Sequence, residues 1–224
     1  MSNRKETKFL ATEGSGEVSA IIDFDHHSKA VFVFAHGAGA PMTHTFMEDL
    51  SQALLQKSVA VFRFNFPYME GTRGRPDPPA RATMTIDNAA KAALSHLPGL
   101  PLFIGGKSFG GRMSSQLAAK KEVEDLKGLV YVGFPLHAPG KEGTERAAHL
   151  ADIKVPQLFL QGTRDALAKP DLIKEVTDPL DLASVIYYEG ADHSFKVLKS
   201  LGISHEDMMD KLSTDISNWI SSIL

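Results

Sequence analysis

Short apolar runs alternate with amphipathic segments along most of the chain. The runs have the length and the β-branched character of buried strands; they cover residues 30–35, 59–66, 100–106, 126–134, 155–162 and 183–190. Between them, helical spacing of apolar residues predicts helices over 46–56, 85–97 and 111–121. A last amphipathic helix begins at Ser204, whose spacing from Asp207 is that of a capping box. Residues 16–25 precede the alternation and predict an antiparallel hairpin strand at one edge of a sheet.

This order of elements predicts an α/β fold. The central strands are apolar on both faces, which is typical of a doubly wound, mostly parallel sheet with helices on both faces. Two segments rich in Gly and Pro, residues 67–81 and 135–149, follow strands. They are predicted to be loops at the carboxyl edge of the sheet, where such proteins bind ligands. The second loop is too short for a cap domain, so we expect a minimal cap or none.

Length and composition indicate a single domain spanning residues 1–224. The formal net charge of -3 creates no strong field for nucleic acid or an acidic membrane surface, so neither is expected as a partner. The absence of cysteine excludes disulfides, a thiolate nucleophile and Cys-ligated zinc. The sequence shows no secretory signal and no apolar run long enough to span a bilayer. We therefore expect a cytoplasmic protein.

The segment GGKSFGG, residues 105–111, fits two motifs with different chemistry. As the end of a phosphate-binding loop, G-x-x-x-x-G-K-[ST], it would need a glycine at the position that Pro101 occupies. As a nucleophile elbow, G-x-S-x-G, it needs a strand before it and a helix after it, and both are predicted. The pattern therefore favours Ser108 as a nucleophile. A plain glycine-rich turn with a solvent-facing serine would have the same sequence and remains the alternative.

A nucleophilic serine requires a base and an acid that orients the base. In an elbow-type fold the acid and then the histidine follow later strands. Asp165 comes just after the strand at 155–162, and His193 just after the strand at 183–190. Both are therefore predicted to lie at the same sheet edge as Ser108. For the acid, three nearby aspartates stay open as alternatives: Asp171, Asp178 and Asp181.

Backbone N–H groups on two sides of Ser108 are the expected oxyanion donors. One is the amide of Phe109, at the start of the helix that follows the serine. The other is predicted in the small-residue segment HGAGA, with Ala38 as the first candidate and Gly39 as the next. This segment matches G-x-G-x-x-G only at its first two glycines, so a dinucleotide site is not favoured. The histidines show no metal-binding spacing, so no catalytic metal is expected.

Four landmarks follow the order found in the α/β-hydrolase superfamily: AHGAGAP, GKSFGGRM, QGTRD and GADHSF. The chain resembles that superfamily over nearly its whole length. More narrowly, HGAGAPMTH, FRFNFPYME, GGKSFGGRMSS and GFPLHAPGK resemble a small subgroup of uncharacterised hydrolases related to dienelactone hydrolases. In animals a testis-expressed protein and a subunit of a histone-acetyltransferase complex represent that subgroup. The resemblance implies a Ser-Asp-His hydrolase without a metal or organic cofactor. Dienelactone hydrolases use a cysteine nucleophile, so their chemistry does not transfer directly to Ser108.

Together these features predict a soluble serine hydrolase with an open site, acting on small carboxylic esters or thioesters. Tyr68, Arg73 and Arg75 are candidate substrate contacts in the loop at 67–81, and for Tyr68 packing in the core stays open as the alternative. The arginines would pair with a substrate carboxylate or phosphate, or else with acidic side chains of their own loop. Two other functions stay open: an interaction module with this fold and little or no turnover, and an acyltransferase or peptidase that uses the same triad.

Overall fold

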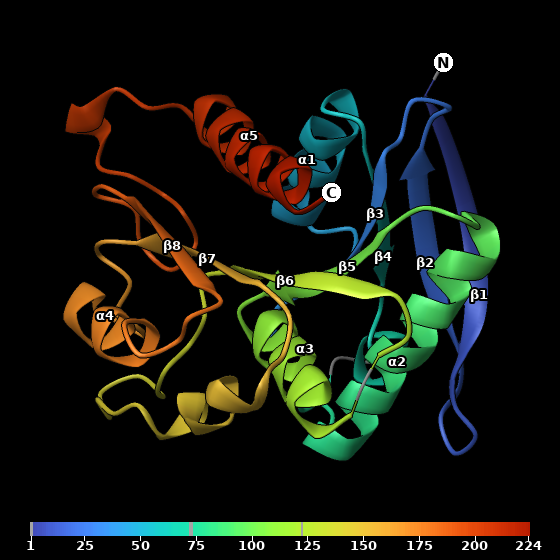
Figure 1. Ribbon diagram of the computed structural model, residues 1–224, viewed down its shortest axis with the longest axis horizontal. Helices are drawn as coiled ribbons and strands as arrows, with labels where there is room; N and C mark the ends of the chain where they lie inside the picture. Colours follow the sequence, from blue (N-terminus) through green and yellow to red (C-terminus); the bar gives the residue numbers. More distant parts are fainter. Residues whose placement is uncertain (1, 72–73, 122) are drawn as a thin grey trace.

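The computed structural model describes residues 2–71, 74–121 and 123–224, which contain one twisted sheet of eight strands (Figure 1). The strands are β1 (Asn3–Thr12), β2 (Gly16–Phe24), β3 (Ala30–Ala35), β4 (Val59–Phe64), β5 (Leu102–Lys107), β6 (Leu126–Val132), β7 (Gln157–Gly162) and β8 (Ala183–Tyr188). Their order is β1-β2-β4-β3-β5-β6-β7-β8. β2 pairs antiparallel with β1 and β4, and every other pair is parallel. The chain winds outward from β3 in both directions, so the predicted doubly wound, mostly parallel sheet is confirmed.

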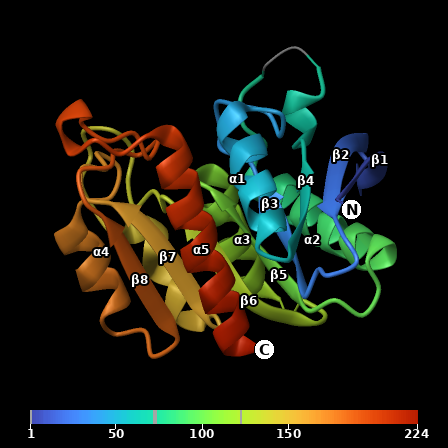
Figure 2. The ribbon, with the colours of Figure 1, turned by 90° about the horizontal axis from the view of Figure 1, so that it is seen from above.

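Helices cover both faces of this sheet. On one face α1 (Thr45–Gln56) packs beside α5 (His205–Ile223), and α5 lies over β6 and β7 (Figure 2). The other face is covered by α2 (Pro79–His96), α3 (Phe109–Lys120) and α4 (Pro170–Thr177) (Figure 1). None of the helices in the three described ranges is long and apolar enough to cross a bilayer.

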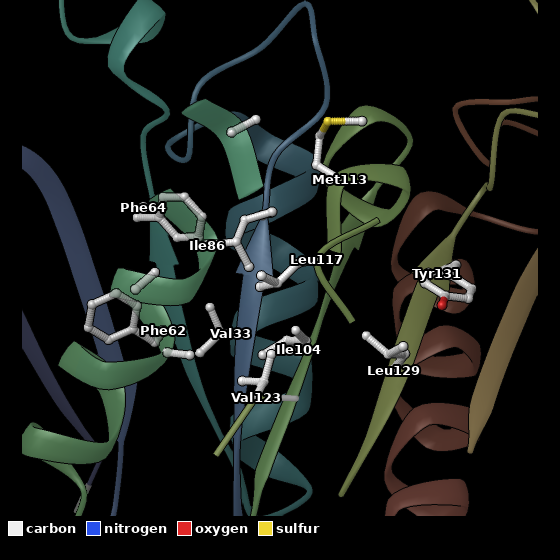
Figure 3. Packing of buried hydrophobic residues seen from close by; sticks show 14 of the residues in the cluster. Val33, Phe62, Phe64, Ile86, Ile104, Met113, Leu117, Val123, Leu129 and Tyr131 are labelled. Atoms are coloured by element: carbon white, nitrogen blue, oxygen red, sulfur yellow. The ribbon is translucent and has the colours of Figure 1, made fainter. Parts of the chain in front are cut away.

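An apolar core lies on each side of the sheet. Strands β3, β4 and β7 are buried along their whole length, because successive side chains enter the two cores in turn. Figure 3 shows part of the core under α2 and α3, where Val33 and Ile104 of adjacent strands lie near Ile86 and Leu117 of the helices. Full burial of one such side chain contributes about 1.5–3 kcal/mol. The buried sheet therefore holds the loops at its carboxyl edge in fixed positions relative to one another.

The structure corrects the expected position of residues 16–25. β2 forms a hairpin as predicted, but it lies one strand in from the edge because β1 pairs with its outer side. Most of β1 is exposed, including Arg4, Lys5 and Lys8, so hydrophobic periodicity gives little signal for it. Charged side chains of this kind are typical of edge strands, where they oppose pairing with another sheet.

Both segments that were predicted to be loops contain helical turns. In the first, η1 (Pro67–Met69) precedes α2, which begins earlier than predicted, at Pro79. Proline suits the first helical position because the N–H that it lacks has no helical partner there. In the second, η2 (Glu145–Asp152) packs against α3. A third turn, η3 (Lys199–Leu201), precedes α5.

Candidate active site

Ser108 lies in the sharp turn between β5 and α3. Its φ of +51° and ψ of -111° fall outside the regions that residues other than glycine favour. Two neighbouring glycines make the turn possible, since a Cβ atom at Gly106 or Gly110 would overlap the carbonyl oxygen of Ala35 in β3. Close packing of the backbones of β3, β5 and α3 thus holds the strained serine at the carboxyl edge of the sheet.

The structure brings the three predicted catalytic residues into one hydrogen-bonded chain. The Oγ of Ser108 lies 2.8 Å from Nε2 of His193, and Nδ1 of His193 lies 2.7 Å from Oδ2 of Asp165. A carboxylate only accepts hydrogen bonds, so Nδ1 carries the proton and Nε2 can accept the proton of the serine. Asp165 is buried, whereas the three alternative acids are exposed: Asp171, Asp178 and Asp181. The geometry suits nucleophile, base and acid, and these catalytic roles remain predictions.

Gln161 fixes the carboxylate of Asp165, a contact that the sequence alone does not predict. Its buried side chain accepts the N–H of Phe134 at Oε1 (3.0 Å), which leaves Nε2 to donate to Oδ2 of Asp165 (2.7 Å). The N–H of Leu167 donates to Oδ1 at 2.8 Å. With the bond from His193, the carboxylate accepts three hydrogen bonds and is held in one orientation. Its only signal in the sequence is a polar residue at the carboxyl end of a strand, directly after the apolar run at 158–160.

A cleft of about 580 Å³ opens over Ser108 and His193. Its walls are the small-residue loop at 37–40, the start of α1 with its N-cap at 44–47, and the segment around Ser194. Among the described residues that line it are two lysines and three histidines but no acidic side chain. The predicted site is thus a depression with room for a small group, and no carboxylate among its described lining residues would repel an anionic one.

The predicted oxyanion donors flank the serine. Ala38 lines the cleft, and a Cβ atom at its neighbour Gly37 would lie 3.8 Å from Cβ of Ser108. Phe109 is the first residue of α3. Within the described part of the chain, the N–H groups of Ala38, Gly39 and Phe109 donate to no protein acceptor. These amides are therefore available to a ligand, and their role as oxyanion donors remains a prediction.

The candidate substrate contacts are not gathered in the cleft over Ser108. Tyr68 is buried, and its hydroxyl lies against the carbonyl groups of Gly37 and Ala38. Arg75 is exposed and lines a different hollow with Tyr68. Arg73 lies outside the described residues. A role in substrate binding for these residues stays a prediction, and for Tyr68 the contacts indicate a different role.

Lys107 links the turn that carries Ser108 to the segment that carries His193. A charged side chain ordinarily faces solvent or an acidic partner, but the Nζ of Lys107 donates to the carbonyl oxygen of His193 at 2.6 Å. The ammonium also lies 5.9 Å from the ring centre of Phe46 and 5.6 Å from that of Phe195. Burial lowers the pKa of Lys107 to about 8, against the opposing attraction of Asp165 and Asp192. The residue before Ser108 therefore anchors the segment that carries His193.

The lowered pKa of Lys107 makes the folding stability depend on pH. Between about pH 8 and 10 the unfolded chain holds this proton and the folded protein does not, so stability rises with pH. We expect the free energy of unfolding of the wild type, relative to Lys107→Met, to rise by about 2 kcal/mol between pH 8 and pH 10. Urea unfolding of both proteins at the two pH values measures this. Parallel changes in the two proteins would show that the ammonium is not desolvated in the fold.

Comparisons with known proteins agree with this architecture. A family model described as an alpha/beta hydrolase domain matches residues 28–221. A dienelactone hydrolase from Anabaena variabilis superposes with a TM-score of 0.79 at 15% identity, over 100% of this chain and 99% of that one. An alpha-beta serine hydrolase homologue from Coxiella burnetii gives a TM-score of 0.74 at 20% identity, over 95% and 96% of the two chains. An a/b serine hydrolase without lid from Xanthomonas campestris gives 0.73 at 19% identity, over 99% and 95%.

At these sequence identities the structural likenesses show the fold, including the minimal cap. Membership of the narrower subgroup of hydrolases that the sequence motifs resemble stays a prediction. The family model spans most of the chain and includes Ser108, Asp165 and His193. The chain therefore belongs to the alpha/beta hydrolase domain family.

Proposed function

We propose that this protein is a serine hydrolase that cleaves small carboxylic esters or thioesters through an acyl-enzyme on Ser108. The observation that carries the proposal is the continuous hydrogen-bonded chain from Ser108 through His193 to Asp165, next to backbone amides that have no acceptor among the described residues. A serine hydroxyl becomes an effective nucleophile when a base accepts its proton as it attacks. The tautomer of His193 that Asp165 selects leaves Nε2 able to do so.

In the acylation step, Oγ of Ser108 forms a bond to the substrate carbonyl carbon while its proton moves to Nε2 of His193. The carbonyl electron pair moves to the oxygen, where the amides of Phe109 and Ala38 would stabilise the negative charge. When the electron pair returns, the bond to the leaving group breaks, and His193 transfers its proton to the departing alkoxide or thiolate. Asp165 stabilises the imidazolium between these two transfers.

Deacylation repeats the same sequence with water. His193 takes a proton from the water molecule as its oxygen attacks the acyl carbon, and then returns that proton to Oγ of Ser108. The products are a carboxylic acid and the regenerated serine. A dienelactone hydrolase has this fold and, by its name, cleaves a lactone, which is a cyclic ester; this supports an ester-type substrate. The small open cleft favours a short acyl group over a long buried chain.

A fluorophosphonate probe tests the proposal because it reacts with a serine only when an adjacent base activates it. We expect the probe to label the wild type at Ser108 and to leave Ser108→Ala unlabelled, as measured by mass spectrometry of the intact protein and its peptides. Ser194→Ala is the matched control, since Ser194 lines the same cleft but lies outside the hydrogen-bonded chain. A folded wild type that resists the probe would refute the proposal and favour an interaction module.

A panel of short esters, thioesters and peptides, given to the wild type and to Ser108→Ala, would then identify the bond that is cleaved. Turnover of esters or thioesters that depends on Ser108 supports the proposal. Turnover of peptides alone would reassign the same triad to a peptidase.

A further inference from the structure

The small-residue loop at 37–40, beside Ser108, is held on the side away from the cleft by residues 65–68, which follow β4. His36 lies at the start of this loop and is fully buried. The N–H of Phe66 donates to Nε2 of His36 at 3.0 Å, so Nε2 carries no proton. Nδ1 must then carry the proton, and it donates to the carbonyl oxygen of Gly37 at 2.7 Å. Burial lowers the pKa of His36 to about 4, so this tautomer persists at neutral pH.

Tyr68 contacts the same carbonyl group and the one that follows it in the loop. Its hydroxyl lies 3.3 Å from the oxygen of Gly37 and 3.1 Å from the oxygen of Ala38. The hydroxyl has a single proton, so the two carbonyl groups share it. Burial raises the pKa of Tyr68 well above its usual value, which keeps the donor proton in place. Two consecutive peptide groups therefore direct their carbonyl oxygens to one side, toward His36 and Tyr68.

The direction of these carbonyl groups determines where the amides point. In a trans peptide the C=O of one residue and the N–H of the next point in opposite directions, and the peptide bonds of the described residues are trans. The N–H groups of Ala38 and Gly39 therefore point away from Tyr68. Ala38 and Gly39 line the cleft with Ser108, whereas His36 and Tyr68 lie behind the loop. The amides are thus directed toward the cleft.

We propose that Tyr68 and His36 are positioning residues that build the oxyanion site, by holding the carbonyl groups of Gly37 and Ala38 so that the amides of Ala38 and Gly39 face the substrate. This inference rests on the proposed function. It also explains why Tyr68, a candidate substrate contact by sequence, is absent from the cleft lining. Tyr68 acts on the substrate through the loop rather than by contact.

The end of β4 and the segment after it also hold the far end of the loop and the ring of Phe109. At the far end of the loop, Arg63 donates to the carbonyl oxygen of Met42 at 3.0 Å, and Asn65 accepts the N–H of Met42 at 3.0 Å. The ring of Phe109, whose amide is the other predicted donor, lies 6.3 Å from the ring of Tyr68 and nearly perpendicular to it. One stretch of chain therefore sets the relative position of the two groups of donors. This gives the FRFNFPY motif a physical role.

Tyr68→Phe is the direct test because it removes one hydroxyl and keeps the ring packing. With a short ester substrate, we expect kcat to fall about 10- to 100-fold and KM to change less than about threefold, since the amides act mainly on the charge of the transition state. A trifluoromethyl ketone, which forms a tetrahedral oxyanion on Ser108, should lose affinity by a similar factor. Tyr187→Phe is the matched control, because the hydroxyl of Tyr187 contacts Pro170 on another part of the surface.

The outcomes separate this inference from the proposed function. If the wild type neither hydrolyses esters nor reacts with the probe, both fail. If the wild type is active and Tyr68→Phe keeps its kcat and its affinity for the ketone, the oxyanion inference alone is overturned. A rise in KM at constant kcat would also overturn it and would assign Tyr68 to substrate binding. Equal losses in Tyr68→Phe and Tyr187→Phe would attribute the effect to general destabilisation.

Discussion

Replacement of His193 by alanine is expected to lower kcat for a short ester by on the order of 10⁴- to 10⁶-fold while the protein stays folded. The imidazole is the only side chain hydrogen-bonded to Oγ of Ser108 in the described part of the chain. Without it, the serine proton has no acceptor during attack, and the leaving group receives no proton when it departs. Steady-state kinetics on an activated ester, with active-site titration, measures the loss. Far-ultraviolet circular dichroism establishes that the variant has folded.

His205→Ala is the matched control for this prediction. His205 lines the same cleft, but its ring pairs with Asp49 at 2.8 Å and its side chain is 54% exposed. An exposed pair of this kind contributes little to stability, so the variant should fold normally. His205 is hydrogen-bonded to Asp49 and not to Ser108, so we expect kcat to change less than about threefold. Comparable losses in the two variants would mean that a general change in the cleft, rather than proton transfer by His193, reduces the rate.

The alternation of strands and helices and the positions of the candidate catalytic residues could be predicted because each depends on short-range features of the chain. The strand before Ser108, the two glycines around it and the helix after it are contiguous, so a local motif identifies the elbow. Asp165 and His193 follow strands, and in a parallel sheet all strand ends of one kind lie at one edge. Their convergence in space therefore follows from topology, without knowledge of any side-chain contact.

The supporting contacts could not be predicted because they join segments through particular loop conformations. Whether Tyr68 meets substrate or backbone depends on the path of η1, and no periodicity specifies that path. Gln161 differs from its apolar strand neighbours, but the choice between a core hydrogen bond and a bond to Asp165 depends on the turn that follows. Lys107 carries a charge, which favours solvent as the default expectation, and only the assembled cleft reveals its carbonyl partner. These contacts account for most of what the structure adds to the site.

Gly105→Ala is expected to destabilise the protein by about 4 kcal/mol or more, which corresponds to a fall of roughly 10 °C in Tm for a chain of this size. Gly105 lies in β5 three residues before Ser108, and a Cβ atom there would overlap the carbonyl oxygen of Val130 in the adjacent strand. The overlap involves backbone on both sides, so no flexible side chain can move to relieve it. Thermal and urea unfolding measure the loss.

Gly14→Ala is the control for Gly105→Ala, since Gly14 lies in the turn between β1 and β2 and an added Cβ would meet nothing within 4 Å. We expect its stability to change by less than about 1 kcal/mol. Equal stability of the two variants would contradict the tight strand contact.

If Gly105→Ala folds at low temperature, we also expect its Ser108 to react more slowly with the fluorophosphonate probe. The turn is fixed to β6 by the bond from the N–H of Ser108 to the carbonyl oxygen of Val132, at 3.1 Å. Separation of β5 from β6 would weaken that bond and release the strained conformation on which the position of Oγ depends.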